Sequence, residues 1–344
     1  MKEDVKYKDN IILGNSLDVL KKLKSNSIDL VITSPPYFQQ RDYGNGNTGI
    51  GNERTEDDYL ENLLQIFYES VRVTKNTGAI VYNLGDKYIN GGLSLLPYKF
   101  AIKATKSKSV FLVNEITWSK LNPTPRQDNR KLVQATEPFF IFAKSKKYTF
   151  NLKYFLKHLD DINKAGKKHS KKLGLTYFKL IEDSELSESD KNKAKIELNR
   201  AIESVHNGTI SGFRMKIRGI HKLAYGGQSG GRNNQIINNG FTIIKINGNK
   251  LKKDLIESPV EITKDIKHPA VYPLYIIQEL IKLLSNQGDI ILDPFNGSGT
   301  TCLAAKKLRR HYIGIEVNEG YVIQSRIRLE KADNQQELYL WKNK

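Results

Sequence analysis

The sequence predicts an α/β domain with a mostly parallel sheet, interrupted by an inserted polar segment. Short apolar runs of strand length alternate with helical stretches in residues 8–150, and the same alternation returns in residues 268–330. Strands that alternate with helices are typical of parallel sheets, because each helix carries the chain back to the end of the sheet where the next strand begins. Between these two parts, residues 151–265 are polar and rich in lysine and glycine. This change of composition indicates an insertion hung on the sheet.

The expected elements follow from hydrophobic periodicity. In the first part, strands are expected at 11–13, 28–32, 78–82, 115–118 and 139–143, with a helix at 57–73. The last part continues with a helix at 275–284, a strand at 289–292, a helix at 300–308 and a strand at 311–316. Within the insertion, residues 184–205 have a charged helical pattern. We therefore divide the chain into 8–150, 151–265, 266–330 and a C-terminal tail at 331–344.

The charge of the chain indicates a polyanionic partner. The formal net charge is +18 and the sequence pI is about 9.6. Residues 151–267 hold 23 lysines and arginines against 13 acidic residues, and residues 204–253 hold nine basic residues, nine glycines and no acid. A basic, glycine-rich segment of this kind suits a surface that lies against phosphates. A solvated loop with a chance bias is the alternative.

Composition also excludes several classes of protein. The single cysteine, Cys302, excludes an internal disulfide, and no cluster of cysteine and histidine suggests a metal site. No apolar run approaches membrane-spanning length, and the first residues, Met1 to Asp4, lack the apolar stretch of a signal peptide. A cytoplasmic protein that does not enter a membrane is therefore expected.

The stretch TSPPY, at residues 33–37, directly follows the expected strand at 28–32. Two prolines cannot continue a strand in a sheet interior, so the strand ends here. Proline has no N–H, and the residue before a proline is held extended, so this turn offers hydrogen-bond acceptors with few competing donors. Taken alone, the stretch favours a turn that merely ends a strand.

The second motif, ILDPFNGSGTTCLAA at residues 291–305, has the order strand, acid, glycine loop, helix. Glycines allow a ligand to approach the backbone, and a helix N-terminus offers free N–H groups to an anion. About twenty residues later a second strand ends in Glu316, the spacing used to bind ribose hydroxyls. A phosphate-binding P-loop would need a lysine that GSGTT lacks. The expected ligand therefore carries a ribose and an anionic group without a polyphosphate, which S-adenosylmethionine satisfies.

Together the two motifs resemble those of β-class DNA amino-methyltransferases, which methylate the exocyclic amine of cytosine or adenine. The resemblance rests on SPPY at 34–37 and DPFNGSGTT at 293–301, and it extends to NLGDKY at 83–88, TEPFFIFAKSKKY at 136–148 and HPAVYP at 268–273. The order also agrees, because in this class the catalytic tetrapeptide precedes the cofactor loop and a target-recognition region lies between them. It implies a class I methyltransferase (Rossmann-like) fold with one antiparallel strand, a hairpin near Phe139.

The resemblance implies the roles of the first motif. Ser34, Pro35, Pro36 and Tyr37 would form the catalytic turn. The Ser34 hydroxyl and the Pro35 carbonyl would accept hydrogen bonds from the base amine, and Tyr37 would stack on a base flipped out of the duplex. A serine hydroxyl can also donate, so Ser34 could bond either to the amine or to the neighbouring ring nitrogen.

The resemblance likewise implies the cofactor site. The residues expected to contact S-adenosylmethionine are Asn15, Asp293, Phe295, Asn296, Gly297, Gly299, Thr300 and Glu316. Asp293 would lie near the methionine amino group, and Asn15 stands where the family usually has aspartate beside the adenine ring. Phe295 is interpreted either as pocket lining or as a core aromatic residue, and Thr300 as a carboxylate ligand or as a helix cap. His268 is expected to be structural, and Cys302, which lacks a neighbouring proline, is not expected to be a covalent nucleophile.

Target recognition is expected in residues 151–265, with the run at 213–235 as the best candidate for DNA contact. Its basic residues are Arg214, Lys216, Arg218, Lys222 and Arg232. The implied partners are double-stranded DNA and a cognate restriction endonuclease, for a bacterial or phage-encoded enzyme that is a monomer or a dimer. Because the tetrapeptide begins with serine, cytosine N4 is favoured over adenine N6.

Two other classes of protein remain as alternatives. A protein glutamine methyltransferase has a similar tetrapeptide, but it places the cofactor loop first and needs no basic insertion. A non-catalytic nucleic-acid-binding protein could retain a relic of the cofactor fold. Intact motifs at 34–37 and 293–301 argue against such decay.

Overall fold

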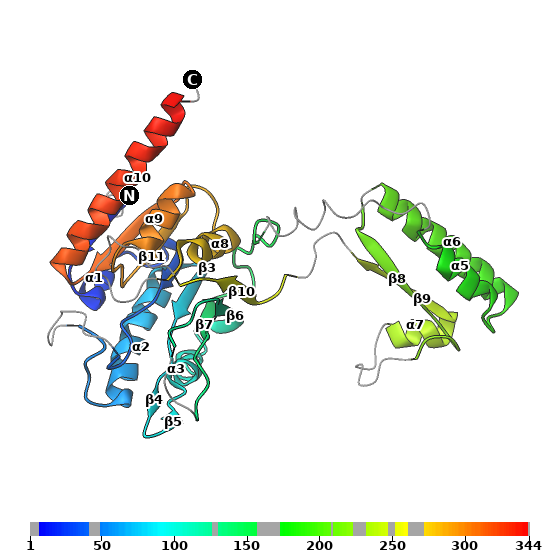
Figure 1. The fold of residues 1–344 in the computed structure, drawn as a ribbon, viewed down its shortest axis with the longest axis horizontal. Coiled ribbons are helices and arrows are strands. Elements are labelled where there is room, and N and C mark those ends of the chain that lie inside the picture. The colour runs from blue at the N-terminus through cyan, green and yellow to red at the C-terminus, as the bar shows by residue number, and fades with distance from the viewer. Residues whose placement is uncertain are drawn as a thin grey trace. The chain divides into compact units, whose positions relative to one another are not determined.

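The computed structural model describes residues 7–40, 49–125, 130–156, 173–207, 209–222, 232–246, 252–260 and 272–342. The chain forms two compact units (Figure 1). Unit 1 consists of Met1–Phe155 together with Lys253–Lys344, and unit 2 consists of Leu156–Lys252. Among the described helices, none is both long and apolar enough to cross a membrane.

Unit 1 contains an eight-stranded sheet with the order β1-β12-β11-β2-β3-β7-β6-β10. The strands are β1 (Asn10–Leu13), β2 (Ile28–Thr33), β3 (Thr74–Asn83), β6 (Phe111–Lys120), β7 (Thr136–Ala143), β10 (Leu255–Ser258), β11 (Ile290–Asp293) and β12 (His311–Glu316). Strand β7 runs antiparallel to both of its neighbours, whereas every other neighbouring pair is parallel. The predicted Rossmann-like class with one antiparallel strand is confirmed.

Helices cover both faces of this sheet (Figure 1). They are α1 (Ser16–Lys22), α2 (Glu56–Val73), α3 (Leu96–Thr105), α8 (Leu274–Leu284), α9 (Thr300–Lys307) and α10 (Glu319–Lys342). Helices α1, α2 and α3 pack in one core cluster with Val31, Ile80 and Leu292 of the central strands. Side chains alternate along a strand, so the buried residues Leu30, Val81 and Ile291 belong to the opposite face. Helices α8, α9 and α10 lie on that face.

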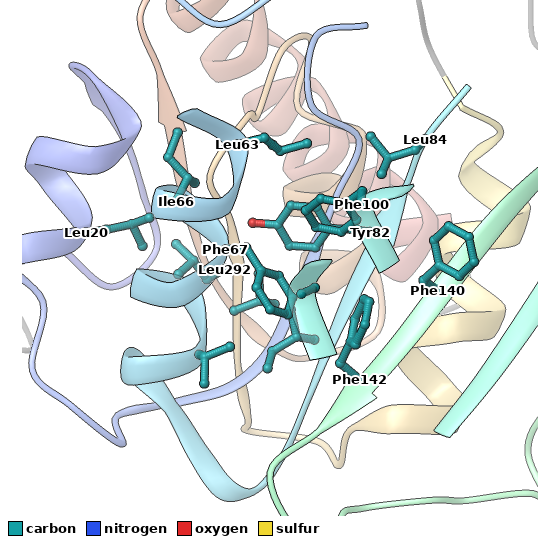
Figure 2. Close-up of a cluster of buried hydrophobic side chains, with 14 of the residues drawn as sticks. Leu20, Leu63, Ile66, Phe67, Tyr82, Leu84, Phe100, Phe140, Phe142 and Leu292 are labelled. Carbon is teal, nitrogen blue, oxygen red and sulfur yellow. The ribbon is translucent and has the colours of Figure 1, made fainter. Parts of the chain in front are cut away.

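The centre of the core cluster is aromatic (Figure 2). The ring of Phe67 on α2 meets Phe142 at 4.9 Å between centroids and Tyr82 and Phe100 at 5.4 Å, all in edge-to-face geometry. Edge-to-face contacts place the positive ring edge on the negative face and favour a unique packing. Helix α2 is therefore held firmly against β3, the strand beside the catalytic turn.

Several elements differ from the sequence-predicted boundaries. Strand β10 lies in the range assigned to the insertion, yet it pairs with β6 in the main sheet. Helix α10 runs to Lys342 through the range assigned to the tail. Helix α3 and the small hairpin of β4 (Tyr88–Ile89) and β5 (Gly92–Leu93) were not predicted, because short elements carry a weak periodic signal.

Unit 2 has its own small core. It contains α5 (Leu175–Glu182), α6 (Glu188–His206), β8 (Gly212–Ile217), α7 (Arg232–Asn239) and β9 (Phe241–Ile246). Strands β8 and β9 pair antiparallel, and Phe213, Met215 and Ile217 alternate inward onto α5 and α6. Arg214 and Lys216 consequently share the opposite face of this ribbon. Helix α6 corresponds to the charged helix predicted at 184–205.

Candidate functional site

The two motifs of unit 1 meet at one edge of the sheet. The catalytic turn begins where β2 ends at Thr33, and the cofactor loop begins where β11 ends at Asp293. Strands β2 and β11 are parallel neighbours, with Leu30 beside Ile291. Ligands of open α/β sheets bind outside the carboxyl ends of such strands. Two motifs that lie far apart in the sequence are thus brought together in a typical ligand site.

A buried hydrogen bond joins the two motifs directly. The Thr33 hydroxyl donates to Asp293 Oδ1 at 2.5 Å, and the Phe295 N–H donates to the same oxygen at 3.0 Å. The hydroxyl of Tyr272 donates to Asp293 Oδ2 at 3.1 Å and also contacts the Thr301 hydroxyl. Burial raises the pKa of Asp293, and these donors partly offset the rise. Asp293 therefore fixes the start of the catalytic turn relative to the cofactor loop.

The cofactor loop presents an uncapped helix N-terminus. Gly299 is the N-cap of α9, and as a glycine it has no side chain to cap the first N–H groups; within the described part of the chain, α9 has no side-chain cap hydrogen bond. Thr300 does not cap the helix, contrary to one of its two interpretations, because it is the first helical residue and its hydroxyl accepts from Arg328 at 2.8 Å. Free N–H groups at a helix N-terminus suit a carboxylate. The donor set thus fits the anionic end of S-adenosylmethionine.

Gly299 could not be replaced by a residue with a side chain. Its φ is +82°, and a Cβ there would overlap Ser325 of α10. The position is left-handed, where glycine avoids the steric cost that other residues incur. Glycine at 299 therefore serves loop geometry and helix packing, and a bulkier residue would disturb the fold as well as the ligand site.

Glu316 and Asn296 support the same loop from within the protein. Glu316 ends β12, and its carboxylate accepts from Gly297 N at 2.8 Å and from Asn318 N at 2.9 Å. Burial raises the pKa of Glu316. The Asn296 amide donates to Ser325 Oγ at 3.0 Å and its carbonyl accepts from the Cys302 thiol at 3.0 Å. Both side chains thus hold the loop in place.

Asn15 lies beside this site at the end of the neighbouring strand. Strand β1 pairs with β12, and Leu13 lies opposite Glu316. Asn15 caps α1, since its Oδ1 accepts from Leu17 N at 2.9 Å, and its predicted contact with an adenine ring stays a prediction. The next residue, Ser16, donates to the Pro294 carbonyl at 2.6 Å. Phe295 is half-buried and packs partly against the core cluster, as its second interpretation requires.

Tyr37 is packed more deeply than a stacking residue is expected to be. Its side chain is 9% exposed, and a Cβ on Gly85 would lie 2.5 Å from the ring. Gly85 belongs to the stretch NLGDKY, so the lack of a side chain there makes room for the ring. In this conformation one flank of the ring is covered by backbone. Stacking on a flipped base remains a prediction and requires the other flank.

The carbonyl groups of the turn are not equivalent. The Pro36 carbonyl accepts from the Tyr59 hydroxyl at 2.9 Å, which anchors the turn to α2. Within the described residues, no donor reaches the Pro35 carbonyl. Ser34 is partly exposed, and its hydroxyl donates to the Tyr37 hydroxyl at 3.4 Å. Ser34 is therefore partly accessible to a ligand, whereas Pro35 is buried, so the access of a base to the Pro35 carbonyl stays a prediction.

Cys302 is unsuited to nucleophilic catalysis. It is fully buried in α9, and burial raises the pKa of its thiol well above the usual range. A thiol held in the protonated form is a poor nucleophile. Among the described residues, no group of three or more metal-ligating side chains is found. His268 lies outside the described residues.

The predicted DNA-contact residues belong to unit 2. Arg214 and Arg218 are exposed, Lys216 is half-buried on the outer face of β8, and Lys222 is exposed beyond that strand. Arg232 is the first residue of α7, and its side chain lies outside the described part. Arg218 Nη1 also donates to the Ile237 carbonyl at 2.9 Å, so this arginine braces the unit.

Sequence reasoning assigned no role to four residues that the structure places at the site: Thr33, Asn83, Glu137 and Tyr272. Asn83 and Glu137 lie on β3 and β7, and both accept from the Tyr37 hydroxyl at 3.0 Å. Three of the four stand inside stretches that carry the resemblance. Position within those stretches was the available signal, but hydrogen bonds between distant strands leave no local pattern.

Comparison with known proteins agrees with this geometry. Residues 28–326 match a protein family described as DNA methylase. The curated type II methyltransferase M.SfiI of Streptomyces fimbriatus is 27% identical over 377 residues, covering 91% of this chain and 89% of that protein. The solved PvuII DNA methyltransferase (cytosine-N4-specific) has a TM-score of 0.58 at 16% identity, covering 94% of this chain and 89% of that one.

A putative DNA modification methylase of Thermus thermophilus, solved in complex with S-adenosyl-L-methionine, has a TM-score of 0.52 at 18% identity, covering 94% of this chain and 93% of that one. At such low identities the solved structures show only that the fold is shared. The family match over most of the chain shows the family to which the chain belongs. The chain, with its serine tetrapeptide hydrogen-bonded through Thr33 to the acid of the cofactor loop, belongs to the family of DNA amino-methyltransferases.

Proposed function

We propose that this chain is the modification enzyme of a type II restriction-modification system, and that it methylates the N4 amine of cytosine in double-stranded DNA. The observation that carries the proposal is the placement of Ser34 and the Pro35 carbonyl beside the cofactor loop through the Thr33–Asp293 hydrogen bond. The likeness to type II methyltransferases over about nine-tenths of the chain supports the biological setting.

S-adenosyl-L-methionine is the methyl donor of this family, and its sulfonium supplies an electrophilic methyl group when bound. The uncapped N-terminus of α9 would hold its carboxylate, and Glu316 at the end of β12 would lie near the ribose. Asp293 would accept a hydrogen bond from the methionine amino group of the cofactor, through the carboxylate lone pairs that Thr33 and Tyr272 do not use. Asn15 would serve the adenine ring.

The residues of the turn would act on the base amine. Its lone pair is delocalised into the ring, so it is a poor nucleophile until acceptors engage its N–H groups. Ser34 Oγ and the Pro35 carbonyl are acceptors of this kind. The rigid turn would then add alignment and proximity, which lower the barrier without a covalent enzyme intermediate.

Serine at position 34 favours cytosine over adenine. Adenine enzymes that resemble this chain more often begin the tetrapeptide with aspartate or asparagine. Adenine N6 is the second candidate, because both bases present an amine beside a ring nitrogen. A protein glutamine methyltransferase is disfavoured by the match to a DNA methylase family.

Nucleoside analysis tests the choice of base. DNA from a host that expresses the chain is expected to contain N4-methylcytosine after digestion and mass spectrometry against both standards. Expression of the Ser34→Ala variant provides the control for modification by host enzymes. Finding N6-methyladenine alone would refute cytosine but leave the family membership intact.

Unit 2 is proposed to bind the DNA target. Its β8 strand exposes Arg214 and half-exposes Lys216 on the face that does not pack on α5 and α6. Phosphate contact is the expected role of such residues, whereas reading of guanine edges would need bidentate geometry.

Arg214→Ala is expected to weaken DNA binding and to reduce the slope of log affinity against log salt by about one. The matched control is Arg200→Ala on α6, a second exposed arginine of unit 2, which is paired with Glu197 at 2.5 Å. Fluorescence anisotropy with labelled duplex at several salt concentrations measures both variants. An unchanged slope for Arg214→Ala, or an equal change for the control, would count against phosphate contact by β8.

A further inference from the structure

A buried ion pair lies next to the catalytic turn and has no part in the mechanism described so far. Glu137 of β7 and Lys120 of β6 are joined at 2.5 Å, and both side chains are largely buried, with exposed fractions of 14% and 17%. Burying two charges costs free energy that an apolar pair would not cost. Because of this cost, an ion pair that is retained beside a proposed reacting group is a candidate for a functional role.

The Glu137 carboxylate is the end of a chain of hydroxyl groups. Ser34 Oγ lies 3.4 Å from the Tyr37 hydroxyl, which in turn lies 3.0 Å from Glu137 Oε2. A carboxylate cannot donate a hydrogen bond, and the other oxygen of Glu137, Oε1, accepts from the Lys120 ammonium. Tyr37 must therefore act as the donor towards Glu137.

The orientation of the Asn83 amide also makes the Tyr37 hydroxyl a hydrogen-bond donor. Its amide NH2 donates to the Pro138 carbonyl at 3.1 Å, which turns Oδ1 towards Tyr37 at 3.0 Å. Two acceptors, Asn83 Oδ1 and Glu137 Oε2, thus face the Tyr37 hydroxyl. Its single proton is donated to one of them or shared between the two. The Tyr37 oxygen is left as an acceptor for the Ser34 hydroxyl proton.

We propose that Glu137 is a positioning residue that polarises the Ser34–Tyr37 hydroxyl chain, so that Ser34 Oγ faces the substrate as a hydrogen-bond acceptor. A serine hydroxyl could otherwise donate to the ring nitrogen beside the target amine. With its proton directed to Tyr37, Ser34 Oγ offers lone pairs to the amine N–H. The inference rests on the proposed function, since it concerns the same base site.

Glu137→Gln tests this proposal because glutamine has nearly the shape of glutamate but reverses the direction of the hydrogen bond with Tyr37. The Lys120 ammonium donates only, so it attracts the carbonyl oxygen of the introduced glutamine and turns the amide NH2 towards Tyr37. An NH2 at that place donates to the Tyr37 oxygen and competes with Ser34 for it. We expect the single-turnover methylation rate to fall about 10- to 100-fold, the size of one misdirected hydrogen bond in a buried site.

Two measurements separate positioning from a general structural effect. Affinities for S-adenosyl-L-methionine and for duplex DNA are expected to change by less than about twofold, so the loss lies in the rate. Glu115→Gln is the matched control, because Glu115 of β6 also accepts from a tyrosine hydroxyl, that of Tyr98 at 3.3 Å, away from the turn. That control is expected to keep the wild-type rate.

A double-mutant cycle completes the test. Tyr37→Phe removes the hydroxyl that links Ser34 to Glu137, so Glu137→Gln should cause no further loss in that background. An additive loss, or a Glu137→Gln rate within about twofold of wild type, would overturn the proposal. If Glu137→Gln fails to fold, a wild-type rate in Tyr37→Phe overturns it and a reduced rate supports the hydroxyl chain. Methylation of cytosine or adenine by the wild-type chain is scored first, so failure of the proposed function is recognised separately.

Discussion

Ser34→Ala is expected to lower the single-turnover methylation rate by about 100- to 1000-fold, the usual effect of removing one group that stabilises a transition state in a buried site. The substitution deletes one of the two acceptors proposed to face the base and leaves the Pro35 carbonyl. It removes no contact from the cofactor loop, which is tied to the turn through Thr33. Rapid-quench assays with pre-bound labelled S-adenosyl-L-methionine measure the rate.

Cofactor affinity provides the contrast for this prediction. Calorimetry with S-adenosyl-L-methionine is expected to give wild-type affinity for Ser34→Ala, because the lost hydroxyl is proposed to face the base. Ser107→Ala, at an exposed turn before β6, is the control serine. A wild-type rate for Ser34→Ala would remove Ser34 from the base site, and a lost cofactor affinity would move it to the cofactor site.

Asp293→Ala is expected to abolish measurable S-adenosyl-L-methionine binding. It removes the carboxylate proposed for the cofactor amino group and also leaves the Thr33 and Tyr272 hydroxyls without their shared acceptor. Each buried donor left unsatisfied costs about 1–3 kcal/mol of folding stability, so the alanine variant is expected to be destabilised. Calorimetry for binding and urea denaturation for stability separate the two effects.

Asp293→Asn is the variant that keeps the shape of the site. It retains one oxygen as acceptor and removes the negative charge, so we expect a folded protein with weakened cofactor binding. The pKa of Asp293 is raised by burial, so the folded state holds a proton there more tightly than the unfolded state. Through this group the wild-type chain loses stability as pH rises from the ordinary carboxyl pKa of 3.8 through the raised folded value.

The unfolding free energy of wild type minus that of Asp293→Asn should therefore decrease as pH increases over that interval. Urea denaturation of both proteins at several pH values between acid and neutral measures this difference. A difference that is constant with pH, or wild-type cofactor affinity in Asp293→Asn, would contradict the assignment of a buried functional carboxylate at 293.

The sequence by itself determined the sheet and the family. The strands at 28–32 and 311–316 lie within a residue of β2 and β12, because a buried parallel strand is a continuous apolar run whose ends are marked by proline, glycine or an acid. The two motifs also identified the cofactor loop, since close backbone approach and a helix N-terminus need glycines at fixed spacing. Such features are local, so they can be recognised without the fold.

Only the tertiary structure decided which residues act together. The Thr33–Asp293 hydrogen bond joins β2 to β11, and the chain from Ser34 through Tyr37 ends on Glu137 of β7. Strand β10 likewise joined the main sheet, although its sequence falls in the polar range assigned to the insertion and resembles it in polarity. Pairing between distant strands and the direction of a buried hydrogen bond depend on partners far away along the chain, and no local pattern of side chains records them.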